Sequence, residues 1–202
     1  YNQKWKYPPE TILSHSFFAR YPEEYYRFHR EKLVIDNVKP NAAHLKLAEL
    51  EQKGKLRAVV TQNIDGLHQL AGSRNVYELH GSIYRNHCME CGKSYTVEQL
   101  KDMPNVPICS CGGVIKPDVV LYEEGLDADT LRAAITHITR ADMLIVGGTS
   151  LNVYPASGLI DYYKGNKLAL INKSETPYDY RADLIINDSI GMALDKATEG
   201  LE

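Results

Sequence analysis

Short apolar segments that alternate with helical patterns constrain the fold of this chain more than any other feature of its sequence. The segments are apolar on both faces, as strands are in a sheet covered on both sides, and they span residues 58–61, 76–79, 143–146, 168–171 and 184–186. A helical turn is expected over 67–71, and longer helices over 129–139, 155–163 and 190–199. Strands that alternate with helices in this way predict an α/β fold, an open parallel sheet with helices on both faces.

Two helices are predicted before the first strand. Pro22 opens the earlier one, which runs to about residue 32, because proline and the acidic residues after it suit the first turn of a helix. Pro40 and Asn41 precede the second helix, and Gly54 ends it.

The charge and length of the chain exclude some classes of function. Its 202 residues can bury one sizeable core, and its net charge of −3 argues against nucleic acid as the main partner, because phosphate binding needs a basic face. Its apolar runs fall short of the roughly 20 residues that a membrane helix requires, so we expect no membrane span. The chain starts at Tyr1 without an apolar signal segment, and we expect a cytoplasmic protein in which Tyr1 is an interior position.

All four cysteines lie within 24 positions, as a CxxC pair and a CxC pair: Cys88, Cys91, Cys109 and Cys111. Each pair lets two thiolates converge from one turn, and two such turns can close a tetrahedral shell around Zn²⁺. Redox disulfides or unrelated buried thiols are the alternatives, and they explain the paired spacing less well. Four sulfur ligands leave no position for water, so the metal should hold structure. We predict a small zinc-binding module over 83–116, between parts 1–82 and 117–202 of a larger domain, in a reducing compartment.

Polar side chains follow the first two predicted strands, and the carboxyl ends of parallel strands border the ligand crevice of such sheets. Gln62, Asn63 and Asp65 follow the first strand and suit a ligand rich in hydroxyls and amides, such as a ribose or a carboxamide. The alternative is an Asx-type turn that caps the next helix. His80 follows the second strand beside Gly81 and can serve as a general base near neutral pH. Taken alone, such a histidine is more often structural, but its place at the same sheet edge as Gln62 and Asp65 favours a functional role.

The later strands end in residues of the same kind. Gly148, Thr149 and Ser150 can approach and bind a phosphate, although such a run could also be a plain turn. Asn172 follows the next strand and could bind a ribose diol. The stretch 116–123 leads back from the cysteines, and it is either a segment that pairs with a substrate backbone or an ordinary connector.

Taken in order, these motifs resemble those of the sirtuins. The matching runs are TQNIDGLH at 61–68, ELHG at 78–81, KPDVV at 116–120, GTSL at 148–151 and IN at 171–172, together with the four cysteines, Val153 and Pro155. The match covers the chain from Pro40 to its end and looks most like a bacterial member. Several motifs in one order are far more specific than any one of them.

The resemblance implies a Rossmann-like large domain that binds NAD and a small zinc-bearing domain, with the acylated lysine of a protein or peptide entering between them. It also implies NAD-dependent removal of the acyl group. In the family, the acyl oxygen attacks the ribose carbon that loses nicotinamide, giving an alkylimidate. A histidine then takes a proton from the ribose hydroxyls, and the products are free lysine and O-acyl-ADP-ribose.

The resemblance assigns a role to each matching position. His80 is the base, and Val119 and Val120 pair with the substrate strand. The residues that contact NAD are Gln62, Asn63, Ile64, Asp65, Gly148, Thr149, Ser150, Asn172, Lys173 and Asp188. The four cysteines hold a structural Zn²⁺, which fixes a module too small to fold well without it.

The sequence departs from the family in two places. The glycine-rich segments that supply the family's first strand and cofactor loop precede the part corresponding to Tyr1. We expect a chain that began at Tyr1 to turn over NAD poorly, and equal rates for an N-terminally extended chain would contradict this. Secondly, Tyr26 and His29 stand where members that remove acidic acyl groups carry Tyr-x-x-Arg. His29 replaces the arginine that would grip a carboxylate, so we predict a preference for acetyl or another neutral acyl group over succinyl.

Two other functions compete with NAD-dependent deacylation. One is transfer of ADP-ribose from NAD to a protein by the same pocket, which would leave a modified protein as product. The other is a non-catalytic zinc-ribbon module that binds nucleic acid or protein. It accounts for the cysteines, but it leaves Gln62, His80 and Thr149 without a role, and the acidic balance opposes it.

Overall fold

The computed structural model describes residues 5–35 and 37–201, and these residues form two compact units. The first unit contains the described residues up to 38, together with 63–66 and 80–126, and the second contains 39–62, 67–79 and the residues from 127 onward. The predicted zinc module, 83–116, lies wholly within the first unit, which also includes the N-terminal helices. None of the helices in the described part of the chain is long and apolar enough to cross a membrane.

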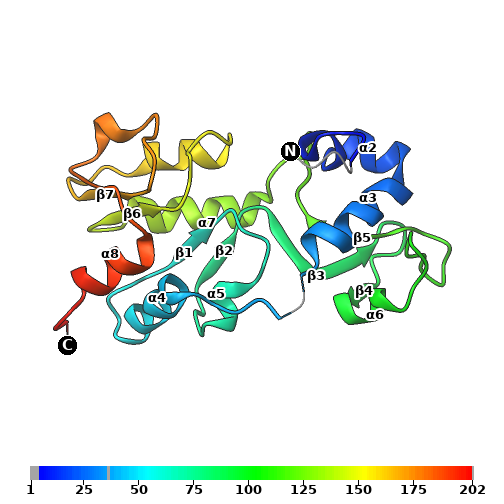
Figure 1. Cartoon of the computed structure of the whole chain (residues 1–202), viewed down its shortest axis with the longest axis horizontal. Coiled ribbons are helices and arrows are strands. Elements are labelled where there is room, and N and C mark those ends of the chain that lie inside the picture. Colours follow the sequence, from blue (N-terminus) through cyan, green and yellow to red (C-terminus); the bar gives the residue numbers. More distant parts are fainter. Residues whose placement is uncertain (1–4, 36, 202) are drawn as a thin grey trace. The chain divides into compact units, whose positions relative to one another are not determined.

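The first unit packs N-terminal helices against a small antiparallel sheet. Its elements are α1 (Pro9–Ile12), α2 (His15–Arg20), α3 (Pro22–Phe28), the π-helical turn η1 (His29–Leu33), β3 (Gly81–Cys88), β4 (Ser94–Thr96), α6 (Val97–Lys101) and β5 (Ile115–Val119). Strand β3 lies between β4 and β5 and is antiparallel to both. In Figure 1, α2 and α3 are drawn in blue, and β4 and α6 in green.

Aromatic side chains of the helices form the core of this unit. Phe18, Tyr25 and Tyr26 pack against Ile83 of β3 and Val119 of β5. The ring centroids of Phe18 and Tyr25 lie 4.9 Å apart at 81°, an edge-to-face contact. The Tyr26 hydroxyl donates to the carbonyl of Ile115, so α3 is tied to β5 by a polar contact as well as by apolar packing.

The second unit contains the predicted parallel strands. Its elements are α4 (Ala42–Gln52), β1 (Val59–Thr61), α5 (Leu67–Leu70), β2 (Val76–Glu78), α7 (Ala128–Thr139), β6 (Leu144–Gly147), the 3₁₀ helix η2 (Ala156–Tyr162), β7 (Leu168–Ile171), the 3₁₀ turn η3 (Asp179–Arg181), β8 (Leu184–Ile186) and α8 (Ile190–Ala197). Helices α4 and α8 lie side by side, and α7 contacts β2 and η2 (Figure 1). The predicted α/β fold class is therefore confirmed.

The parallel strands form two sheets in the part of the chain that the structure describes. Strand β1 pairs with β2, and β6, β7 and β8 pair in that order, all in parallel. No described strand joins β1 to β6.

One glycine of this unit is required by packing. A Cβ added to Gly147 would lie 2.2 Å from Cδ1 of Ile190, which belongs to the core formed by Ile171, Ala193 and Leu194. Glycine thus lets α8 approach the carboxyl end of β6 closely, next to the predicted phosphate-binding residues.

Candidate functional site

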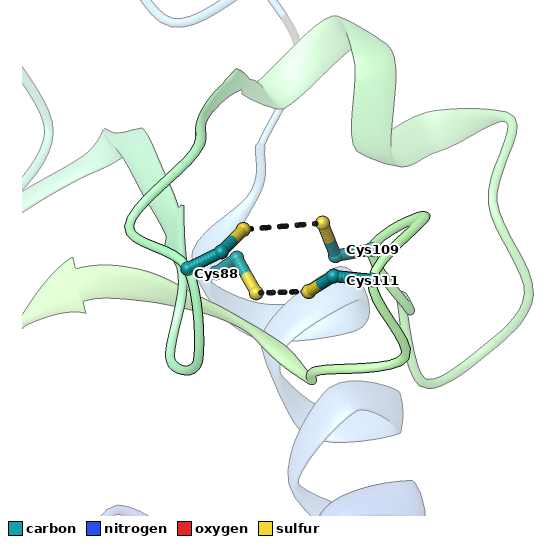
Figure 2. Close-up of side chains that lie close together, drawn as sticks. Cys88, Cys109 and Cys111 are labelled. Atoms are coloured by element: carbon teal, nitrogen blue, oxygen red, sulfur yellow. Dashed lines mark hydrogen bonds between the residues drawn. The ribbon is translucent and has the colours of Figure 1, made fainter.

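Two tight turns bring the four cysteines together in the first unit. Cys88 ends β3, and Cys91 lies in the turn that follows it. Cys109 and Cys111 lie in a second turn, closed by the bond from the Cys109 N–H to the carbonyl of Gly113 at 2.8 Å. Figure 2 shows the sulfurs of the two turns facing one another.

The arrangement of the sulfurs fits a tetrahedral metal ion. Cys88 Sγ lies 3.4 Å from Cys111 Sγ, Cys91 Sγ lies 3.7 Å from Cys109 Sγ, and all four sulfurs lie within 4.8 Å of one another. Zn–S bonds of about 2.3 Å in a tetrahedron place the sulfurs roughly 3.8 Å apart. The four thiolates predicted as ligands therefore come together as a Zn²⁺ site, and such a site is structural because it leaves no position for a substrate or water.

A close approach of backbone to sulfur shapes this centre. A Cβ added to Gly113 would lie 2.7 Å from Cys88 Sγ and 2.6 Å from Cγ of Glu90. Glycine at this position keeps the space beside the sulfur open.

Tyr95 of β4 also belongs to the metal centre, although it was not predicted from the sequence. Its hydroxyl donates to Cys109 Sγ at 3.0 Å. This bond and the partial burial of the ring raise the pKa of Tyr95 to about 12. The backbone N–H of Cys111 and the Tyr95 hydroxyl lower the pKa of the Cys109 thiol to about 6, so the thiolate that a metal needs is favoured. The sequence signal that could have identified Tyr95 is a polar aromatic residue close to a CxxC pair.

The first unit also holds His80 beside the predicted substrate strand. The carbonyl of His80 accepts a bond from the Val120 N–H at 3.0 Å, and the next residue, Gly81, pairs with Val119 in the β3–β5 register. His80 is half-buried. The predicted base and both predicted substrate-pairing residues are thus neighbours in one antiparallel pair of chain segments.

Gly81 permits the close approach between the segment that contains His80 and the strand that contains Val119. Its φ is +75°, and a Cβ at this position would lie 1.8 Å from the carbonyl oxygen of Asp118. Only glycine fits such a left-handed backbone pressed against another strand. The glycine after His80 therefore sets the distance between the histidine and the strand that contains Val119.

Three more predicted residues lie in a loop of the same unit. The Asn63 amide donates to an Asp65 carboxylate oxygen at 3.4 Å, and Asn63 is exposed. The carbonyl of Ile64 accepts a bond from the Ile83 N–H at 3.1 Å, and the Ile64 side chain packs against the aromatic core. The Ile83 contact anchors the loop to β3, close in sequence to His80.

The other predicted NAD contacts lie in the second unit, at the carboxyl ends of its parallel strands. Gln62 follows β1, and its amide donates to the Thr149 hydroxyl at 3.4 Å. Since Thr149 follows β6, this bond joins the ends of the two parallel sheets. The Leu151 N–H also donates to the Thr149 hydroxyl, at 3.1 Å, while Ser150 is exposed.

The loop after β6 can receive a ligand. Gly148 has a φ of +63°, and the space beside its Cα is open, because no atom lies within 4 Å of an added Cβ. Its N–H is bonded to the Ile171 carbonyl at 3.1 Å, which fixes the loop to β7. An open glycine between parallel strand ends, followed by two hydroxyls, fits the phosphates or ribose of a dinucleotide.

Polar residues that were predicted to bind NAD also follow β7 and β8. The Asn172 N–H donates to the Ile186 carbonyl at 3.1 Å, and the Asn172 carbonyl accepts a bond from the Asn187 amide at 3.3 Å. Lys173 and Asp188 are exposed beside them. The register Gly147–Ile171–Ile186 aligns these strand ends, so Gly148, Asn172 and Asp188 share one edge of the sheet.

Tyr26 and His29, the positions on which the acyl prediction rests, line a cavity of about 240 Å³ in the first unit. The His29 side chain is 3% exposed, and its ring nitrogens have no hydrogen-bond partner among the described residues. Burial, with a smaller contribution from the charge of Arg30, lowers the pKa of His29 to about 4. His29 is therefore neutral at pH 7 and offers no cation to an acidic acyl group.

Parallel strands that end in glycine, hydroxyl and amide groups, together with a four-cysteine metal centre, define an α/β nucleotide-binding protein with a structural metal. The chain belongs to the Sir2 family, whose sequence profile matches residues 1–155.

Relatives of known name agree with this assignment. An NAD-dependent protein deacetylase of Clostridium acetobutylicum is 61% identical over 193 residues, which cover 95% of this chain and 79% of the relative. One of Clostridium perfringens is 58% identical over 195 residues, which cover 96% of this chain and 80% of the relative.

Solved structures agree as well. A Sir2 in complex with the inhibitor EX-527, 2′-O-acetyl-ADP-ribose and a deacetylated p53 peptide has a TM-score of 0.88 at 44% identity, over 94% of this chain and 84% of that one. A Sir2 bound to an acetylated peptide has a TM-score of 0.88 at 43% identity, over 94% of this chain and 82% of that one.

Proposed function

We propose that this protein removes acyl groups, above all acetyl, from protein lysines in an NAD-dependent reaction that releases nicotinamide and O-acyl-ADP-ribose. The observation that carries the proposal is the placement of His80 against Val119 and Val120 in a chain of the Sir2 family. A base held beside an extended segment can act on a peptide that pairs with that segment.

In this proposal, residues of each unit take a defined part in binding NAD. Asn63, Ile64 and Asp65 of the first unit bind the nicotinamide side. Residues of the second unit bind the ribose, phosphates and adenosine, and they are Gln62, Gly148, Thr149, Ser150, Asn172, Lys173 and Asp188. The support is that the first group lies in one loop of its unit, and that the second group follows the carboxyl ends of parallel strands of its own unit, where ligands of such sheets bind. When bound, NAD supplies an electrophilic ribose carbon to the acyl oxygen.

The chain's own groups perform the remaining steps. The backbone of Val119 and Val120 pairs with the extended substrate and aligns the acyl-lysine. A ring nitrogen of His80 accepts a proton from a ribose hydroxyl, which makes that oxygen a better nucleophile. The zinc centre takes no part in proton transfer, and it holds the turns at the end of β3 and before β5.

Three further assignments belong to the proposal. The neutral, buried His29 supports acetyl or another uncharged acyl group over succinyl. The cysteine pairs suit a reducing compartment, which supports the cytoplasm as location. The domain limits, 83–116 for the zinc module and the rest for the NAD-binding domain, remain predictions.

The experiment compares wild type, His80→Ala and His137→Gln for NAD-dependent release of free lysine from an acetyl-lysine peptide. His137 is a matched control, because it is a half-buried histidine that bonds Tyr77 at 3.0 Å and takes no part in the proposed chemistry. We expect His80→Ala to lose at least about 100-fold in kcat, in line with general-base catalysis, and His137→Gln to retain the wild-type rate. Full activity of His80→Ala would refute the assignment of the base.

A further inference from the structure

The four sulfurs of the metal centre differ in their surroundings. Cys88 and Cys109 are 1% and 4% exposed, whereas Cys91 and Cys111 lie at the surface. Cys109 also receives the Tyr95 hydroxyl, at 3.0 Å.

The position of the Tyr95 hydroxyl is fixed by its surroundings. Tyr95 lies opposite Asn86 in the β3–β4 pair, and its ring packs on the cluster that contains Cys88, Cys109 and Ile115. The Lys93 ammonium lies 5.3 Å from the ring centroid. The ring therefore cannot turn away from the sulfur without breaking apolar contacts.

We propose that Tyr95 is a positioning residue of the metal centre, whose hydroxyl orients the Cys109 thiolate and withdraws charge from it, so that the site keeps its Zn²⁺ longer. Four thiolates around one dication leave a net charge of about −2 in the site. A donor bond to one sulfur reduces repulsion among the four and holds that ligand in place before the metal arrives. Partners of this kind, one step outside the ligands, typically change metal affinity by about 10- to 100-fold.

The chain offers a matched control for this bond. The Ser110 hydroxyl lies 4.0 Å from the same sulfur, at the limit of a contact, whereas the Tyr95 hydroxyl lies at 3.0 Å. Both Tyr95→Phe and Ser110→Ala remove one hydroxyl near Cys109. Only the first should affect the metal.

The experiment measures the transfer of Zn²⁺ from the whole metal-loaded protein to an excess of a colorimetric chelator. We expect Tyr95→Phe to release Zn²⁺ about tenfold faster than wild type, and Ser110→Ala to match wild type. Replacing Tyr95 by 4-aminophenylalanine, which keeps an N–H donor at the same place in the ring, should restore slow release. This rescue distinguishes the donor bond from ring packing.

A spectroscopic measurement reads the sulfur itself. In Co²⁺-loaded protein, loss of the donor bond raises the energy of the sulfur electrons, so the sulfur-to-cobalt charge-transfer band of Tyr95→Phe should move to lower energy. Release within twofold of wild type and an unmoved band would overturn the proposal, as would an equal effect of Ser110→Ala. Failure of wild type to bind Zn²⁺ or Co²⁺ would overturn the metal site as well, and neither result depends on deacylase activity.

Discussion

Substituting Gly81 by alanine tests whether the fold next to His80 depends on a strand contact that only glycine allows. The φ of +75° alone costs a residue with a Cβ about 1–2 kcal/mol. The added Cβ would also lie 1.8 Å from the Asp118 carbonyl oxygen, so β3 and β5 must separate at the Gly81–Val119 pair. Losing one or two ladder bonds there adds about 1–2 kcal/mol, for a total of about 2–4 kcal/mol.

Gly92 provides the control, because it belongs to the same unit, has a φ of +71° and has no atom within 4 Å of an added Cβ. Gly92→Ala should show the backbone cost without the clash. For a protein of this size, 1 kcal/mol corresponds to roughly 2–4 °C in Tm. In thermal unfolding of the zinc-loaded protein, we expect Gly92→Ala to lower Tm by about 2–8 °C and Gly81→Ala by about twice as much. Equal shifts for the two variants would refute the clash argument.

Three more predictions follow from the site and its supports. Gly113→Ala places a Cβ 2.7 Å from Cys88 Sγ, so we expect less than one Zn²⁺ per chain by elemental analysis after dialysis, and full occupancy would contradict the packing argument. Burial alone would raise the pKa of Glu124, but the Leu121 N–H, His15 and Lys116 lower it. Its stabilising effect is therefore present above its unfolded pKa of about 4.3 and is lost as pH falls through the lower folded value. The difference in urea midpoint between wild type and Glu124→Gln should shrink from pH 7 to pH 3, and a constant difference would contradict it. Finally, His29→Arg should raise the ratio of desuccinylation to deacetylation, in kcat/KM, by about tenfold through a charge-assisted bond; an unchanged ratio would exclude contact between residue 29 and the acyl group.

The regular elements were predictable because they follow from local patterns. The apolar run 168–171 coincides with β7, and the Asn41 cap before α4 bonds the N–H groups of Ala43 and His44. The pattern from Pro22 to residue 32 predicted one helix, but the α-helix ends at Phe28 and continues as the π-helical turn η1. Hydrophobic periodicity does not distinguish these two helical forms here, because a π-helical turn of five residues is too short to show a period of its own.

The contacts that shape the site were harder to predict, because they join residues that are distant in sequence. Bringing the four cysteines together required only two local turns, so their spacing was sufficient. The bond from Tyr95 to Cys109 depends on the register of β3 with β4, and the need for glycine at 81 and 113 depends on how closely another backbone or a sulfur approaches. Without the strand register, the sequence predicts neither the Tyr95–Cys109 bond nor the close approaches at Gly81 and Gly113.

Product analysis with a peptide that contains one acetyl-lysine tests the central claim most directly. The proposed reaction predicts that each lysine freed is matched by one nicotinamide and one O-acetyl-ADP-ribose, and that the peptide loses only the mass of the acetyl group. Nicotinamide release with an intact acetyl-lysine, or with ADP-ribose attached to the protein or peptide, would contradict it.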